Sequence, residues 1–170
     1  ANMKTSTATD QSKDGEAQTA QWLQIDRGAD AQPTDIQAIK MWYNVKVWPM
    51  EYKILTAAES SLTANASADT INLEEWTELV DVSRPSSSAG NGWVANGEGQ
   101  NIADNAANTD TITADTTPAL QEVQLQRYVL VYFSKVNAQA GGHNINLREI
   151  EIFDTTGNIN VQSILNSITA

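Results

Sequence analysis

The feature that most constrains the fold of this chain is a set of short apolar runs whose period is close to two. In residues 21–26, Trp22, Leu23 and Ile25 stand among polar neighbours. In residues 36–43, Ile36, Ala38 or Ile39, and Met41 alternate in the same way. Runs of this kind that end at Gly, Pro, Asp or Asn are typical of β-strands, not helices. Both segments are therefore predicted strands.

The same pattern returns several times along the chain. Further strands are expected over residues 52–57, 76–82, 120–125, 127–136 and 145–153. The core positions expected in 76–82 are Trp76, Leu79 or Val80, and Val82. Residues 127–136 are apolar on both faces, which indicates a central strand or one between two packed sheets. Trp22 and Trp42 are also expected in the core. Many short strands with few helical signals predict an all-β antiparallel sandwich or barrel.

Composition excludes several classes of protein. The chain has 170 residues, enough for one domain with a proper core. Its net charge of −11 disfavours nucleic acid and anionic membranes, which bind cationic surfaces. The absence of cysteine excludes disulfides and thiolate sites. No run of about 18 apolar residues is present, so no membrane insertion is expected. The polar N-terminal residues predict that any targeting segment is removed or lies upstream.

Five segments, in order, resemble discoidin domains, also called coagulation factor type C domains. They are QWLQID, WYN followed by Pro-x-x-Tyr-Lys-Ile, WTELVDV, RYVLVYF and NLREIEIF. The subgroup most similar is the family 32 carbohydrate-binding modules of secreted bacterial glycoside hydrolases. The resemblance covers residues 14–154 and implies a discoidin-like β-sandwich (jelly roll). Residues 1–13 would lead into this domain, and residues 84–118, which are rich in Ser, Gly, Asn and Thr, form a long loop insertion. Residues 155–170 are a closing strand, a short helix or the start of a linker.

A structural calcium ion is expected near the N-terminus. Asp14-Gly15-Glu16 followed by Thr19 offers carboxylates, a tight turn and a hydroxyl within one loop. Calcium prefers six to eight oxygen ligands of these types. The resemblance implies that Glu149 of the last strand completes the metal site. The alternative interpretation is an ordinary turn at Asp14 and a solvated Glu149.

The main functional hypothesis is a sugar site formed by loops at one end of the sandwich. A sugar ring has an apolar face and a rim of hydroxyls, so its site needs an aromatic platform beside polar side chains. The candidate platforms are Trp48, Trp93 and, more weakly, Tyr43. The candidate hydrogen-bonding residues are Asn44, Lys46, Arg84, Asn91, His143 and Asn144. The resemblance implies such a combination on these loops, but galactose-binding members carry a histidine near the position of Asn44.

Four of these residues also have a structural interpretation, in which Trp48 packs over the end of the sandwich, Trp93 pins the insertion to the body of the domain, His143 is an ordinary surface residue and Arg84 pairs with a carboxylate. A catalytic role is disfavoured by the single histidine and the absence of nucleophile or phosphate-loop motifs. The predicted function is a non-catalytic module that targets a larger secreted or cell-surface bacterial protein, a glycoside hydrolase or adhesin, to a terminal mono- or disaccharide of a glycan. The isolated domain is expected to be monomeric. The alternative is a protein-adhesion or structural domain.

Overall fold

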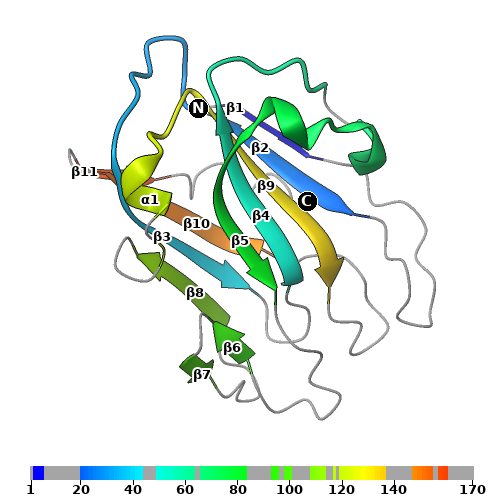
Figure 1. Cartoon of the computed structure of the whole chain (residues 1–170), viewed down its shortest axis with the longest axis vertical. Coiled ribbons are helices and arrows are strands. Elements are labelled where there is room, and N and C mark those ends of the chain that lie inside the picture. Colours follow the sequence, from blue (N-terminus) through cyan, green and yellow to red (C-terminus); the bar gives the residue numbers. More distant parts are fainter. Residues whose placement is uncertain are drawn as a thin grey trace.

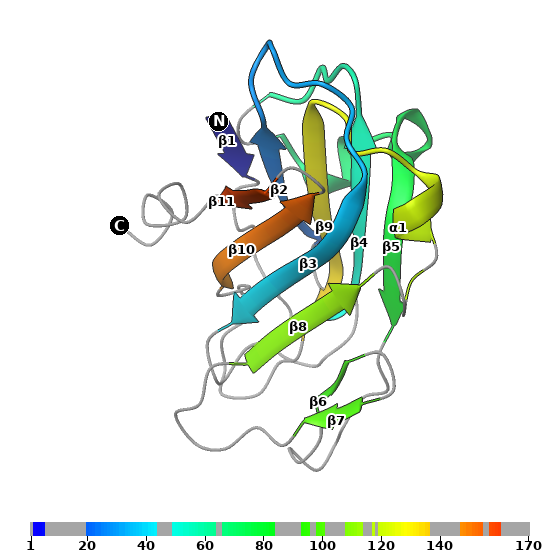
Figure 2. The ribbon, with the colours of Figure 1, turned by 90° about the vertical axis from the view of Figure 1, so that its left-hand side faces the viewer.

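The structure is a computed structural model that describes residues 2–5, 20–43, 49–63, 66–83, 93–95, 98–100, 108–113, 117, 119–136, 147–154 and 157–160. Two antiparallel sheets face each other and enclose the core between them (Figures 1 and 2). The predicted all-β antiparallel sandwich is therefore confirmed.

The larger sheet has five strands in the order β1-β2-β9-β4-β5. Their bounds are Asn2–Thr5 (β1), Gln21–Asp26 (β2), Tyr128–Val136 (β9), Pro49–Ala57 (β4) and Thr77–Ser83 (β5). The central position of β9 confirms the prediction made from its two apolar faces. The first strand, β1, lies inside the segment that was expected only to lead into the domain.

The smaller sheet has four strands in the order β11-β10-β3-β8. Their bounds are Gly157–Asn160 (β11), Leu147–Asp154 (β10), Ile36–Tyr43 (β3) and Asn108–Thr113 (β8). A separate two-stranded ladder joins β6 (Trp93–Ala95) and β7 (Glu98–Gln100). The short helices are η1 (Ala68–Thr70), η2 (Leu73–Glu75) and α1 (Ala119–Glu122). None of the helices in the described part of the chain has the length and hydropathy needed to cross a membrane.

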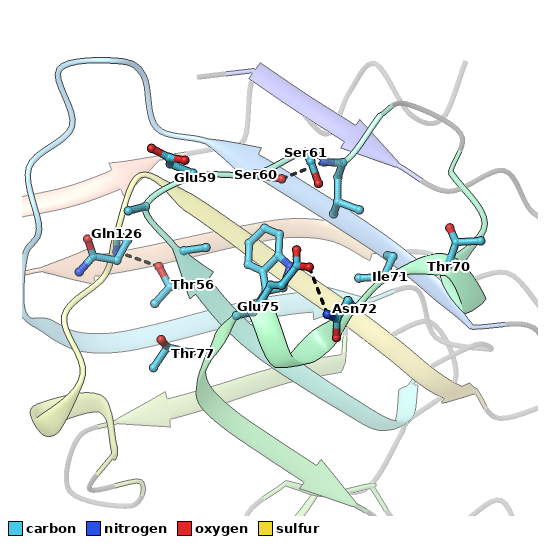
Figure 3. A pocket seen from close by; sticks show the side chains of 14 residues that line it. Thr56, Glu59, Ser60, Ser61, Thr70, Ile71, Asn72, Glu75, Thr77 and Gln126 are labelled. Carbon is cyan, nitrogen blue, oxygen red and sulfur yellow. Dashed lines mark hydrogen bonds between the residues drawn. The ribbon is translucent and has the colours of Figure 1, made fainter.

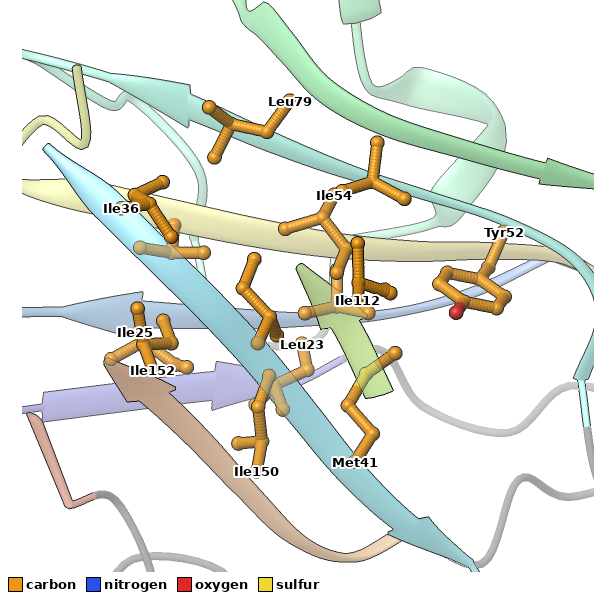
Figure 4. Packing of buried hydrophobic residues seen from close by; sticks show 14 of the residues in the cluster. Leu23, Ile25, Ile36, Met41, Tyr52, Ile54, Leu79, Ile112, Ile150 and Ile152 are labelled. Atoms are coloured by element: carbon orange, nitrogen blue, oxygen red, sulfur yellow. The ribbon is translucent and has the colours of Figure 1, made fainter. Parts of the chain in front are cut away.

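The main core fills the space between the sheets (Figure 4). Val129, Val131 and Phe133 of β9 point into it, and Ile150 and Ile152 of β10 enter it from the opposite sheet. All five side chains are at most 3% exposed. Burial of this kind stabilises the fold by about 25 cal/mol for each Å² of apolar surface removed from water.

A second apolar layer covers the outer face of the five-stranded sheet. The segment from residue 58 to residue 76 crosses this face with η1 and η2, and the residues described in it include Leu62, Ile71 and Trp76, which pack against Trp22 and Leu130. The Trp22 Nε1–H donates to the Ala66 carbonyl at 2.9 Å, and the Ser60 hydroxyl donates to buried Gln24 at 2.9 Å. We call this segment the covering segment. Because Leu130 of β9 is buried in this layer, the second face of β9 is apolar as well.

The structure corrects several of the sequence predictions. Residues 119–122 form helix α1 where a strand over 120–125 was expected. The 84–118 range, expected as a loop insertion, contains strand β8, which is hydrogen-bonded to β3 along its whole length. Trp22 is buried as expected, in the apolar cluster on the outer face of the five-stranded sheet, whereas Trp42 and Trp76 are only partly buried. Among the three alternatives left open for the C-terminal tail, the described residues 157–160 form a closing strand, β11.

Candidate functional site

The strand ends that flank the three predicted ligand loops meet at one end of the sandwich. β3 ends at Tyr43, where its partner is Leu147, the first residue of β10. In the other sheet, Pro49 at the start of β4 pairs with Val136 at the end of β9. Figure 2 shows these ends at the lower side of the two sheets. We call this the loop end.

β5 and the small β6–β7 ladder belong to the same end. Ser83, the last residue of β5, pairs with Glu51, two residues after the start of β4. β6 lies against β8, whose first residue, Asn108, pairs with Tyr43. The chain therefore leaves β3, β5 and β9 at the loop end, each towards one of the three loops that carry predicted ligand residues.

The described residues include only part of the predicted sugar site. Tyr43 is the last residue of β3 and Trp93 the first residue of β6. The other seven predicted residues lie outside the described residues: Asn44, Lys46, Trp48, Arg84, Asn91, His143 and Asn144. Their assignment as ligand residues stays a prediction.

A buried polar contact joins the two sheets near the loop end. The Tyr52 hydroxyl of β4 donates to the Asp110 Oδ2 of β8 at 2.8 Å, and both residues are 1% exposed. Asp110 lies two residues into β8, opposite Met41. A carboxylate at this depth requires hydrogen-bond donors around it. Sequence reasoning missed this pair, because Asp110 lies in the range that was expected to be a loop insertion.

Only one of the four predicted calcium ligands, Glu149, is among the described residues. Glu149 lies near the start of β10, opposite Trp42, and is partly buried. Asp14, Glu16 and Thr19 lie outside the described residues, and the described part of the chain contains no group of three or more acidic, histidine or cysteine side chains suited to a metal ion. Gln21, soon after the predicted metal loop, pairs with Phe133 towards the same end of the sandwich. The chemistry of the four predicted ligands suits calcium, and the site itself stays a prediction.

A pocket of about 850 Å³ lies on the outer face of the five-stranded sheet (Figure 3). It is lined by residues 56–62, 70–72, 75–77 and 126. The sheet contributes Thr56 and Ala57 at the end of β4 and Thr77 at the start of β5, and the covering segment contributes most of the rest. The pocket therefore lies at the opposite end of the sheet from the loop end.

The pocket combines one aromatic ring with acidic and neutral polar groups. Trp76 contributes its indole, and Glu59 and Glu75 contribute carboxylates. The Asn72 Nδ2 donates to Glu75 Oε1 at 3.1 Å, and this contact is marked in Figure 3. No lysine or arginine is among the described residues that line the pocket. Sequence reasoning missed this site, since its residues carry no periodicity and come together only where the covering segment crosses the sheet.

Comparison with known proteins adds no family assignment. Neither the protein-family models nor the curated proteins contain a match to this chain.

Proposed function

We propose that this protein is a non-catalytic carbohydrate-binding module whose site lies at the loop end. What supports the proposal is the topology: β3, β4, β5, β9 and β10 begin or end side by side there. Loops placed on a rigid sandwich are a common position for binding residues. The segments that connect these strand ends contain Trp48, Arg84 and His143.

The chemistry of these residues fits a sugar. Trp48 or Trp93 would stack on the apolar face of the ring, and Arg84, Asn91, His143 and Asn144 would donate to its hydroxyls. The likeness to family 32 modules adds a discoidin-like sandwich, a structural calcium ion held by Asp14, Glu16, Thr19 and Glu149, and attachment to a larger secreted or cell-surface bacterial protein. Single sugar sites bind weakly, and linked copies of a module raise the overall affinity.

A glycan array tests the proposal. The intact protein should bind a defined set of terminal sugars, and Trp48→Ala and Arg84→Ala should each weaken binding about tenfold or more, because each removes a stacking or charged contact. Glu74→Gln, an exposed change on η2 at the other end of the sheet, is the control and should leave the array pattern unchanged. No binding to any glycan, or full binding by both loop variants, would reject the proposal.

A further inference from the structure

The pocket on the outer face has walls that are held in place by hydrogen bonds. Thr56 is fully buried, its hydroxyl donates to the Tyr128 carbonyl at 2.9 Å, and its oxygen accepts the Gln126 N–H at 2.7 Å. On the other side, the Ser60 hydroxyl is tied to Gln24, and the Leu62 N–H donates to the Ser60 oxygen at 3.2 Å. The pocket is thus largely formed before any ligand arrives, as is usual for small-molecule sites.

The wall formed by η2 and its C-cap carries a carboxylate and an aromatic ring on consecutive residues. Asn72 caps this helix, because its Oδ1 accepts the Glu74 N–H at 3.2 Å. Its Nδ2 at the same time donates to Glu75 Oε1. This contact restrains the carboxylate of Glu75, which is the residue directly before Trp76 in the chain. Trp76 is itself partly buried, because it packs against the apolar layer under the covering segment.

The charge of the lining limits the class of ligand. Glu59 and Glu75 come from different segments around the pocket, and no basic residue among the described lining residues offsets them (Figure 3). A ligand with a phosphate, sulfate or carboxylate group would meet like charge here. A protonated amine would be attracted both by the carboxylates and by the face of an indole. The hydroxyls of Ser61, Thr70 and Thr77 and the amide of Gln126 add partners for ligand hydroxyls.

We propose that this pocket is a second binding site, specific for an amine-bearing sugar ring. The ring stacks on Trp76, the ammonium group pairs with the Glu75 carboxylate that Asn72 holds, and the remaining hydroxyls bond to the polar rim. The site does not depend on the sugar site at the loop end, since the two lie at opposite ends of the five-stranded sheet.

Three β-1,4-linked disaccharides that share the same ring stereochemistry distinguish the effect of ligand charge on binding from the effect of ring shape. They are the glucosamine dimer, the N-acetylglucosamine dimer and cellobiose, titrated into the intact protein and followed through assigned backbone amide NMR signals. The glucosamine dimer should shift amides of residues 56–62 and 70–77 and bind roughly fivefold more tightly than cellobiose, the size expected for one exposed charge contact. The acetylated dimer, which has lost the cation, should bind no better than cellobiose.

Variants connect this preference to the pocket. Glu75→Gln should remove the roughly fivefold advantage of the glucosamine dimer and leave cellobiose binding within about twofold. Glu74→Gln, on the same helix but outside the pocket lining, should change neither. Trp76→Phe keeps an aromatic ring in the apolar layer and should weaken both dimers by about threefold, because the smaller ring stacks less. An unchanged melting temperature would show that each variant is folded.

Several outcomes would overturn the inference. They are equal binding of the glucosamine and N-acetylglucosamine dimers, amide shifts confined to other parts of the chain, or an unchanged charge preference in Glu75→Gln. The loop-end variants Trp48→Ala and Arg84→Ala should keep the glucosamine response, so that failure of one site is distinguishable from failure of the other.

Discussion

Asp26 ties the end of β2 to the residue before β9. Its two carboxylate oxygens accept from Arg127 Nε at 2.8 Å and from the second guanidinium nitrogen at 2.9 Å, and Oδ1 also accepts the Gly28 N–H at 2.8 Å. Gly28 has a φ of 110°, a backbone conformation that glycine adopts without strain. The hydrogen bonds from Arg127, opposed by partial desolvation and helped by Gly28, lower the pKa of Asp26 from 3.8 to about 2.

This pKa predicts how stability depends on pH. Because the folded state holds Asp26 ionised, its contribution is complete above about pH 4 and is lost as the pH falls through about 2. Asp26→Asn should therefore lower the free energy of unfolding by about 1 kcal/mol at pH 7, after allowance for solvent screening of a partly exposed pair. Urea unfolding of both proteins at pH 7 and at pH 2 measures this. A loss of equal size at both pH values would contradict the ionic explanation.

The next residue, Arg27, stabilises the same end of the sandwich through hydrogen bonds to backbone carbonyls. The Arg27 guanidinium donates through one nitrogen to the carbonyls of Gln32, Leu125 and Gln126 at 3.0–3.1 Å. Burial lowers the pKa of Arg27, and the negative charge of Asp154 opposes that shift. These carbonyls belong to segments far apart in the sequence, so one side chain holds the loop after β2 against the segment before β9.

At the scale of elements, β8 makes a clear prediction. Ile112 is 1% exposed and belongs to the core between the sheets, whereas Thr111 on the same strand is exposed. Ile112→Ala should lower the free energy of unfolding by about 2–5 kcal/mol through lost burial and a residual cavity. Thr111→Ala should change it by no more than about 0.5 kcal/mol. Urea denaturation distinguishes the two, and a small effect at Ile112 would mean that β8 is not a core strand in solution.

The success of the strand predictions depended on how regular each pattern is. Residues 21–26 and 36–43 were predicted with the bounds that β2 and β3 have. The choice between Leu79 and Val80 stayed open for a physical reason: the β4–β5 ladder shifts register between Ile54 and Leu55, and this irregularity lets both Leu79 and Val80 enter the core. β8 reads Asn-Thr-Asp-Thr-Ile-Thr, with one apolar residue, so only its partner β3 identifies it as a strand.

At the scale of the whole molecule, the two candidate sites differ in how far their residues can be predicted from the sequence. Trp48, Arg84 and His143 stand out as aromatic, basic and histidine side chains in segments expected to be loops, so they can be proposed directly. Ser60, Asn72 and Glu75 are ordinary surface residues in a sequence. Their joint position depends on the route of the covering segment across the sheet, which Trp22 and Gln24 determine from the sheet side.

The proposed calcium ion should act on the stability of the whole domain. When the free calcium concentration is about a hundred times the dissociation constant of the site, binding stabilises the folded state by about 2.7 kcal/mol. A chelator should therefore lower the melting temperature by about 5 °C or more. Addition of calcium should restore it, and Glu149→Gln should melt near the chelated value with or without calcium. Equal melting curves with and without chelator would reject the ion.

The sheet order has a consequence for how the chain acquires its structure. One of the two neighbours of β2 in the sheet, β9, is far from it in the sequence. Gln21 pairs with Phe133, and the Asp26–Arg127 contact spans 101 positions. Pairings this distant slow folding, since a long stretch of chain must be ordered before they form. During synthesis on a ribosome, β2 and β4 emerge long before β9, the strand that joins them. The five-stranded sheet can therefore be completed only after β9 has been made.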